Sequence, residues 1–196
     1  MINPLDFEWL RWAGATILLF MLLFGAFILI RYPLGKHASI SRHIASNRVH
    51  YLLMAIFLTF GGGLFYAFLS LWLIPTYHLS PLLYALLAVA FIAQLTMSWV
   101  PDKSPTTKVG RRFHLIHFTG GAIVAISMML SLYFVLASFE NLPLIGSILA
   151  IVSTIFSTLS IMLFILVKKT RQHFLWYESV FILLFALAMF SLIFKI

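Results

Sequence analysis

Six uncharged apolar stretches, each long enough to cross a bilayer, constrain the fold of this chain more than any other feature. A helix needs about 20 apolar residues to cross roughly 30 Å of hydrocarbon. The stretches are apolar on every face, whereas the strands of a membrane barrel are shorter and alternate in polarity. They predict an all-α polytopic membrane protein, a single six-helix transmembrane bundle with spans at 12–30, 49–74, 82–100, 113–137, 144–167 and 174–194.

The composition excludes a water-soluble domain of this size. Only 9% of the 196 residues are charged and 63% are hydrophobic, against about 25% charged residues in a soluble domain. The chain has no cysteine, which excludes disulfides, thiolate metal sites and cysteine nucleophiles. The first span is expected to stay in the protein, because Asp6 and Glu8 precede it and no signal-peptidase pattern follows it.

The basic residues of the short connections predict the orientation. Eleven of the 13 Lys and Arg residues fall in the first, third and fifth connections, and the second and fourth contain none. Short loops rich in Lys and Arg stay in the cytoplasm, so both termini are predicted outside a bacterial inner membrane. This distribution accounts for the net charge of +8 without a nucleic-acid partner. Anionic lipid head groups are the expected contacts of Arg42, Arg48, Arg111, Arg112, Lys168, Lys169 and Arg171.

Small residues predict where helices touch, because lipid tails give apolar side chains no reason to leave them. Five such residues share one face of the fifth span: Gly146, Ala150, Ser153, Ser157 and Ser160. The structural interpretation is a tight helix–helix seam whose hydroxyls bond to carbonyls one turn back. The functional alternative is a polar pathway. Three glycines at 61–63 predict a kink or a close crossing by a neighbouring helix, because glycine lowers helix propensity.

Two connections carry local signals. In the first, Ser39 or Ser41 is predicted to cap a helix that leads into the second span. The third, at 101–110, has two prolines and a glycine and is predicted to be non-helical.

Polar side chains inside the spans carry an insertion cost and are therefore the candidates for chemistry. Each lies near a span end that is predicted to face the cytoplasm, so they are expected to form one layer: His50, Gln94, Ser98, His114, His117 and Glu178. The helical spacing places Gln94 and Ser98 on one face, and His114 and His117 on one face. The candidate ligands for zinc or iron, or for proton transfer, are His50, His114, His117 and Glu178. The structural interpretation is interfacial histidines and a Glu178 ion pair.

Aromatic residues cluster at the span ends, as in the aromatic belts of membrane proteins. They are Trp9, Trp12, Tyr32, Tyr51, Trp72, Tyr77, Trp99, Trp176 and Tyr177. The belt interpretation needs no ligand, and all nine are predicted to face the membrane–water interface.

Two segments resemble a known family. Ser39-Ile-Ser41, and the stretch from Gln94 through Trp99-Val-Pro101-Asp102 to His114 and His117, are similar to a group of prokaryotic membrane proteins called domain of unknown function 998. The resemblance implies a six- to seven-helix membrane protein without an established activity. It marks six family-like positions and supplies no reaction: Ser39, Ser41, Pro101, Asp102, His114 and His117.

Two classes of function remain open from the sequence. The leading interpretation is a non-enzymatic membrane protein such as a small transporter, a regulator or an assembly partner, because the chain has no nucleotide-binding loop, G-x-S-x-G or H-E-x-x-H motif. The alternative is a metal-dependent enzyme, for example a lipid hydrolase, with a His/Glu site at the cytoplasmic interface. A divalent metal fits that alternative. Haem is disfavoured, because only His78 lies on the outer side.

Overall fold

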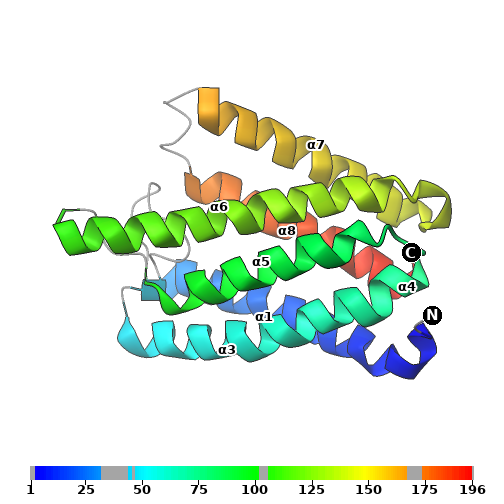
Figure 1. Cartoon of the computed structure of the whole chain (residues 1–196), viewed down its shortest axis with the longest axis horizontal. Helices are drawn as coiled ribbons and strands as arrows, with labels where there is room; N and C mark the ends of the chain where they lie inside the picture. Colours follow the sequence, from blue (N-terminus) through cyan, green and yellow to red (C-terminus); the bar gives the residue numbers. More distant parts are fainter. Residues whose placement is uncertain (1–2, 32–43, 46, 102–105, 167–173, 196) are drawn as a thin grey trace.

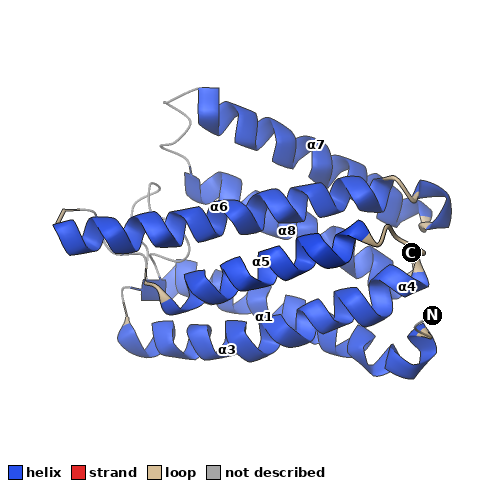
Figure 2. Ribbon diagram, in the orientation of Figure 1, coloured by secondary structure: helices blue, strands red, loops and turns tan. Residues whose placement is uncertain are grey.

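The computed structural model describes residues 3–31, 44–45, 47–101, 106–166 and 174–195. Every regular element within these residues is a helix (Figure 2). Six of the described helices are long and apolar enough to cross a membrane. The predicted all-α, six-helix class is therefore confirmed.

The helices run up and down between two ends of the bundle (Figure 1). Their bounds are η1 Pro4–Phe7, α1 Glu8–Arg31, α3 Arg48–Phe68, the π-helical η2 Leu69–Leu73, α4 Ile74–Thr76, α5 Leu82–Trp99, α6 Lys108–Leu136, η3 Phe139–Asn141, α7 Leu144–Leu166 and α8 Phe174–Phe194. Both chain termini and α4 lie at one end, which we call the termini end. We call the opposite end the basic end, after Arg31, Arg48, Lys108, Arg111 and Arg112.

The helix neighbours follow a simple order. α5 packs most extensively against α6, and α3 contacts both α1 and α5. α7 packs on α8 and α6, while α8 also reaches α1. The best-buried residues concentrate in the half of the bundle near the termini, where Phe68, Trp72 and Leu192 have almost no exposed surface.

The helix starts differ from the sequence predictions. Asn47 caps α3, since its side-chain oxygen accepts hydrogen bonds from the backbone N–H groups of Val49 and His50 at 2.9 and 3.2 Å. The predicted caps, Ser39 and Ser41, lie outside the described residues. Thr107 caps α6, because its hydroxyl oxygen accepts a hydrogen bond from the backbone N–H of Gly110 at 2.9 Å. Residues 108–110 are therefore helical, and the prediction that they belong to a non-helical loop is wrong.

α5 ends just before Pro101, as expected for a helix that meets a proline. The helix stops at Trp99 and Val100 is extended, because a residue that precedes a proline is disfavoured in the helical conformation. Asp102 lies outside the described residues.

The small-residue face of α7 is the predicted seam. Gly146, Ala150, Ser153 and Ser157 are buried, and Ser160 is half-buried. An added Cβ at Gly146 would lie 2.9 Å from Leu192 Cδ2 of α8, so this end of the seam has no spare room. The Ser157 hydroxyl donates to the carbonyl of Ser153 one turn back, as the structural interpretation expects. The Ser153 hydroxyl does not follow this expectation, because it is buried without a hydrogen-bond partner among the described residues.

Overpacking this seam is expected to destabilise the bundle. Leucine at Ser153 or Ser157, which are 1% and 2% exposed, should lower the free energy of unfolding by about 1–3 kcal/mol. Leucine at the half-buried Thr158 loses its hydrogen bond with Tyr133 and should cost about 1 kcal/mol or less. Unfolding in mixed micelles measures the difference. Equal tolerance at all three positions would contradict the seam.

Candidate functional site

Gln94, Ser98 and His117 are polar candidates that form hydrogen bonds in the basic half of the bundle. Gln94 Nε2 donates to the carbonyl of Leu58 at 3.0 Å and so joins α5 to α3. His117 Nδ1 bonds the carbonyl of Val100 at 2.6 Å and so joins α6 to the end of α5. The Ser98 hydroxyl donates to the carbonyl of Gln94 at 2.7 Å. All three side chains are buried, and these bonds satisfy polar groups that would otherwise be costly inside a membrane.

Gly62 explains how Gln94 reaches its partner. An added Cβ at this glycine would lie 2.3 Å from Gln94 Nε2. Only a residue without a side chain therefore leaves room for the amide between α3 and α5. The close crossing predicted from the three glycines at 61–63 is confirmed at this position.

A cavity of about 50 Å³ lies beside these residues at the basic end. α3, α5, α6 and Ile44 line it, and its lining includes the polar residues Tyr51, Ser98 and His117. The rest of the lining is apolar, with Met54 and Met97 among it. We call this space the basic-end cavity.

Tyr51 is the residue of this cavity that the sequence analysis missed. Its hydroxyl is buried and has no hydrogen-bond partner among the described residues, whereas the sequence analysis assigned it to an aromatic belt. One signal was available in the sequence. Tyr51, Ala55, Leu58 and Gly62 recur at helical spacing, so the tyrosine lies on the face that the glycine turns toward α5.

The predicted metal ligands have different neighbours. The ring centroid of His50 lies 6.2 Å from that of Phe27 in α1. The ring centroid of His114 lies 6.2 Å from that of Phe118 in its own helix. His117 bonds Val100, and Glu178 belongs to α8, which does not line the basic-end cavity. No three His, Asp or Glu residues of the described chain form a group that would hold a metal ion. The structure therefore does not gather His50, His114, His117 and Glu178 into a metal site.

Exposed basic residues lie in the first turns of α3 and α6, at the basic end. Arg48, Lys108, Arg111 and Arg112 are exposed. α6 has 29 residues and is about 43 Å long at 1.5 Å per residue, more than the hydrocarbon thickness of a bilayer. Its first turns project farthest from the bundle in Figure 1. The other predicted head-group contacts, Arg42, Lys168, Lys169 and Arg171, lie outside the described residues.

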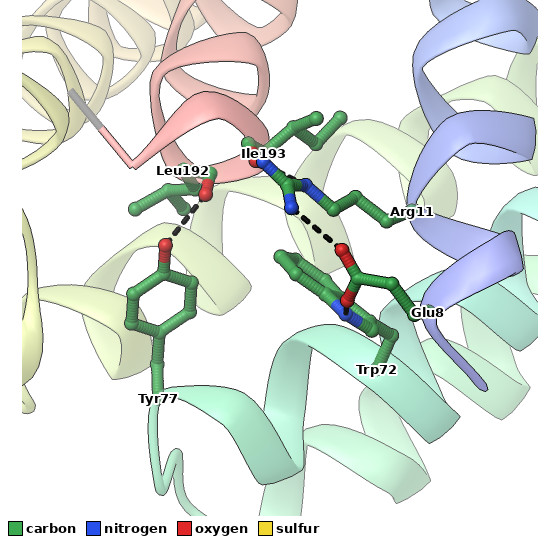
Figure 3. A network of polar contacts seen from close by, with 6 residues as sticks. All are labelled: Glu8, Arg11, Trp72, Tyr77, Leu192 and Ile193. Atoms are coloured by element: carbon green, nitrogen blue, oxygen red, sulfur yellow. Dashed lines mark hydrogen bonds and ion pairs between the residues drawn. The ribbon is translucent and has the colours of Figure 1, made fainter. Parts of the chain in front are cut away.

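A second polar network joins α1, α8 and the π-helical segment at the termini end (Figure 3). The Glu8 carboxylate accepts from Arg11 Nη1 at 2.6 Å and from Trp72 Nε1 at 2.7 Å. Arg11 Nε donates to the carbonyl of Ile193 at 2.7 Å. The guanidinium also lies over the Trp72 ring, 5.7 Å from its centroid. One arginine thus contacts three separate elements.

Tyr77 completes this network. Its hydroxyl donates to the carbonyl of Leu192, and burial raises the pKa of Tyr77 to about 12, so that the donor stays protonated. The last carbonyls of a helix have no partner within the helix, and here Arg11 and Tyr77 supply partners for two of them. We call these residues the terminal clasp: Glu8, Arg11, Trp72 and Tyr77 with the carbonyls of Leu192 and Ile193.

The terminal clasp corrects the aromatic-belt prediction. Trp72 and Tyr77 are 1% and 5% exposed, so the prediction that they face the interface is wrong. Trp9, Trp12 and Trp99 are more than half exposed, as belt residues are expected to be. Hydropathy cannot separate the two groups, because a tryptophan at a span end has the same local sequence in either setting.

A second, apolar cavity of about 30 Å³ adjoins the π-helical segment. Leu69, Leu73 and Ile74 contribute to its wall, together with Tyr66, whose buried hydroxyl has no hydrogen-bond partner among the described residues. This cavity and the basic-end cavity share no lining residue.

No family model matches this chain, and no curated protein or solved structure matches it either. The resemblance to domain of unknown function 998 therefore stays a prediction. Of its six positions, Ser39, Ser41 and Asp102 lie outside the described residues. Pro101, His114 and His117 are described, and of these three His117 lines the basic-end cavity.

Proposed function

We propose that this chain is a non-enzymatic, multi-pass protein of a bacterial inner membrane that binds anionic phospholipid at its basic end. The observation that carries the proposal is the basic-end cavity, which has three polar residues in its wall and exposed cations at the same end. Each basic residue near a membrane surface attracts anionic lipid by about 1 kcal/mol. The distribution of eleven basic residues over three loops supports a cytoplasmic location for this end.

The use of the buried polar groups favours binding over catalysis. Gln94 and His117 join neighbouring elements through backbone carbonyls, and Ser98 bonds a carbonyl of its own helix. Among the described residues, no three His, Asp or Glu form a group that would hold a metal ion.

Lipid retention by the purified protein tests the proposal. In nanodiscs that contain both lipids, phosphatidylglycerol should be enriched around the protein over phosphatidylcholine. Replacing Arg111 and Arg112 together with glutamine should weaken this preference roughly 25-fold, because each charge contributes about 1 kcal/mol. Lys195→Gln removes a charge at the other end and serves as the control. Equal retention of the two lipids by the unmodified protein would refute the proposal.

Elemental analysis of the same sample tests the enzyme alternative. Stoichiometric zinc or iron that is lost in the His114→Ala and His117→Ala variants would favour a metal-dependent hydrolase over the binding function.

A further inference from the structure

The π-helical segment η2 sets the direction of the residues that follow it. The N–H of Ile74 bonds the carbonyl of Leu69, five residues back, whereas an α-helix bonds the carbonyl four residues back. A π-helical turn thus takes up one extra residue, and one residue corresponds to about 100° around a helix axis. An α-helical η2 would therefore turn Tyr77 away from the carbonyl of Leu192, to which it donates in the terminal clasp.

The observed register has local costs. In an α-helix the N–H of Ile74 would go to the Ser70 carbonyl, so the π-helical bond leaves that carbonyl without its usual donor. Pro75 has no N–H in either register, so this turn is held by fewer backbone bonds. His78 follows with φ +50, a left-handed conformation that is unfavourable for residues other than glycine. Such features persist only where surrounding contacts enforce them.

The terminal clasp supplies contacts that enforce this register. Trp72, inside η2, donates to the Glu8 carboxylate at 2.7 Å, and its ring lies under the Arg11 guanidinium (Figure 3). Outside its own span, η2 packs most extensively against η1 and α1. The Glu8 side chain is 41% exposed. A carboxylate that is accessible at the surface is therefore bonded directly to a buried helical turn.

The apolar cavity gives this segment room to turn. Leu69, Leu73 and Ile74 all line this space of about 30 Å³. Side chains in a close-packed interior cannot turn without displacing their neighbours, and a void beside the segment removes part of that obstacle. After η2, only Ile74–Thr76 are helical before the chain turns at Tyr77, so only a short stretch has to move.

We propose that η2 is a two-state segment. The terminal clasp holds it in the π-helical register, and it returns to the α-helical register when the bonds of Glu8 to Trp72 and Arg11 are lost. This return restores the N–H donor of the Ser70 carbonyl and turns Tyr77 by about 100°. The clasp thereby couples a carboxylate at the surface of the termini end to the wall of the apolar cavity. This coupling does not depend on the lipid binding proposed for the basic end.

Spin labels test the proposal, because the chain has no cysteine of its own. Labels on His78→Cys and Asn141→Cys, two exposed positions of the termini end, report where the turn after η2 lies relative to η3. Pulsed electron–electron double resonance in nanodiscs should give one distance between them. Adding Glu8→Ala should produce a second distance, shifted by about 3.5 Å or more, because a rotation of about 100° moves a Cα that far on a helix of about 2.3 Å radius. Asp6→Ala is the matched control, since it removes a carboxylate of the same end outside the clasp, and it should keep one distance.

Deletion of Ser70 separates the register from the loss of contacts. A segment shorter by one residue can be α-helical while Trp72 and Tyr77 keep their directions, so this variant should show the original distance. Adding Glu8→Ala should then produce no second distance, because no other register is available. A second distance that appears equally in the deletion variant would show that lost contacts alone move the turn, and would overturn the proposal. A single unchanged distance in Glu8→Ala would overturn it too.

Pro75→Ala gives a test that needs no deletion. In the α-helical register the proline ring clashes with the carbonyl four residues back, so alanine favours that register. Combined with Glu8→Ala, it should raise the ratio of the second distance to the first roughly tenfold. An unchanged or lower ratio would contradict the two-state segment.

Discussion

Replacing Arg11 with alanine is expected to lower the free energy of unfolding by about 3 kcal/mol, although this residue lies close to the chain terminus. The substitution removes a charged donor from the carbonyl of Ile193, and hydrogen bonds to charged groups contribute about 1.5–3 kcal/mol. It also removes the counter-ion of Glu8 and the contact of the guanidinium with the Trp72 ring, which adds roughly 0.5–1 kcal/mol. Unfolding in mixed micelles, followed by tryptophan fluorescence, measures the loss.

Arg11→Lys separates charge from geometry. Lysine keeps the positive charge, but its ammonium cannot reproduce the fork with which the guanidinium contacts Glu8 and Ile193 together. We expect about half of the alanine effect. Lys195→Ala, at an exposed position of the same end, should leave stability unchanged. If Arg11→Ala unfolds like the unmodified protein, the terminal clasp does not contribute to stability.

Gly62→Ala is expected to have an effect of similar size, about 3 kcal/mol, from the addition of one methyl group. The new Cβ would meet Gln94 Nε2 at 2.3 Å and force the amide away from the carbonyl of Leu58. A buried polar group without its partner costs about 1–3 kcal/mol, and this lost hydrogen bond is the main part of the effect, because the displaced amide is the end of a flexible side chain. The loss would appear as a lower unfolding midpoint in mixed micelles.

Gly63→Ala and Gly25→Ala are the matched controls. An added Cβ at Gly63 would lie at an ordinary 3.7 Å from Phe91, and at Gly25 it would meet nothing within 4 Å. Alanine is the better helix former by about 1 kcal/mol, so both variants should be as stable as the unmodified protein or slightly more stable. A Gly62→Ala variant that behaves like these controls would show that the Gln94 bond is dispensable.

The sequence is sufficient to predict features that depend on depth in the membrane and on spacing along one helix. Six apolar stretches predict the class of fold, and the stripe on α7 predicts its buried face, because both are local patterns. The layer of polar residues near the basic end is likewise a prediction of depth. Gln94, Ser98 and His117 are the members of that layer whose hydrogen bonds the structure describes there.

The sequence is insufficient where the answer depends on which helices are neighbours. Hydropathy does not show which side of a helix faces its neighbours. Tyr51, Trp72 and Tyr77 were therefore predicted to be belt residues. The structure instead buries the hydroxyl of Tyr51 and the whole side chains of Trp72 and Tyr77. The Glu8–Arg11 pair was visible as two charges three residues apart. Its second role, capping the end of α8, connects residues 182 positions apart and has no local signature.

That separation has a consequence for how the protein is made. α1 leaves the ribosome long before α8, and domains form from the N-terminus as synthesis proceeds. During this interval Arg11 has Glu8 as its ion-pair partner within the same helix turn, so the charge is compensated while its carbonyl acceptor does not yet exist. The terminal clasp can form only when α8 arrives with the carbonyls of Leu192 and Ile193. Chains halted before α8 would therefore lack both carbonyl acceptors of the terminal clasp.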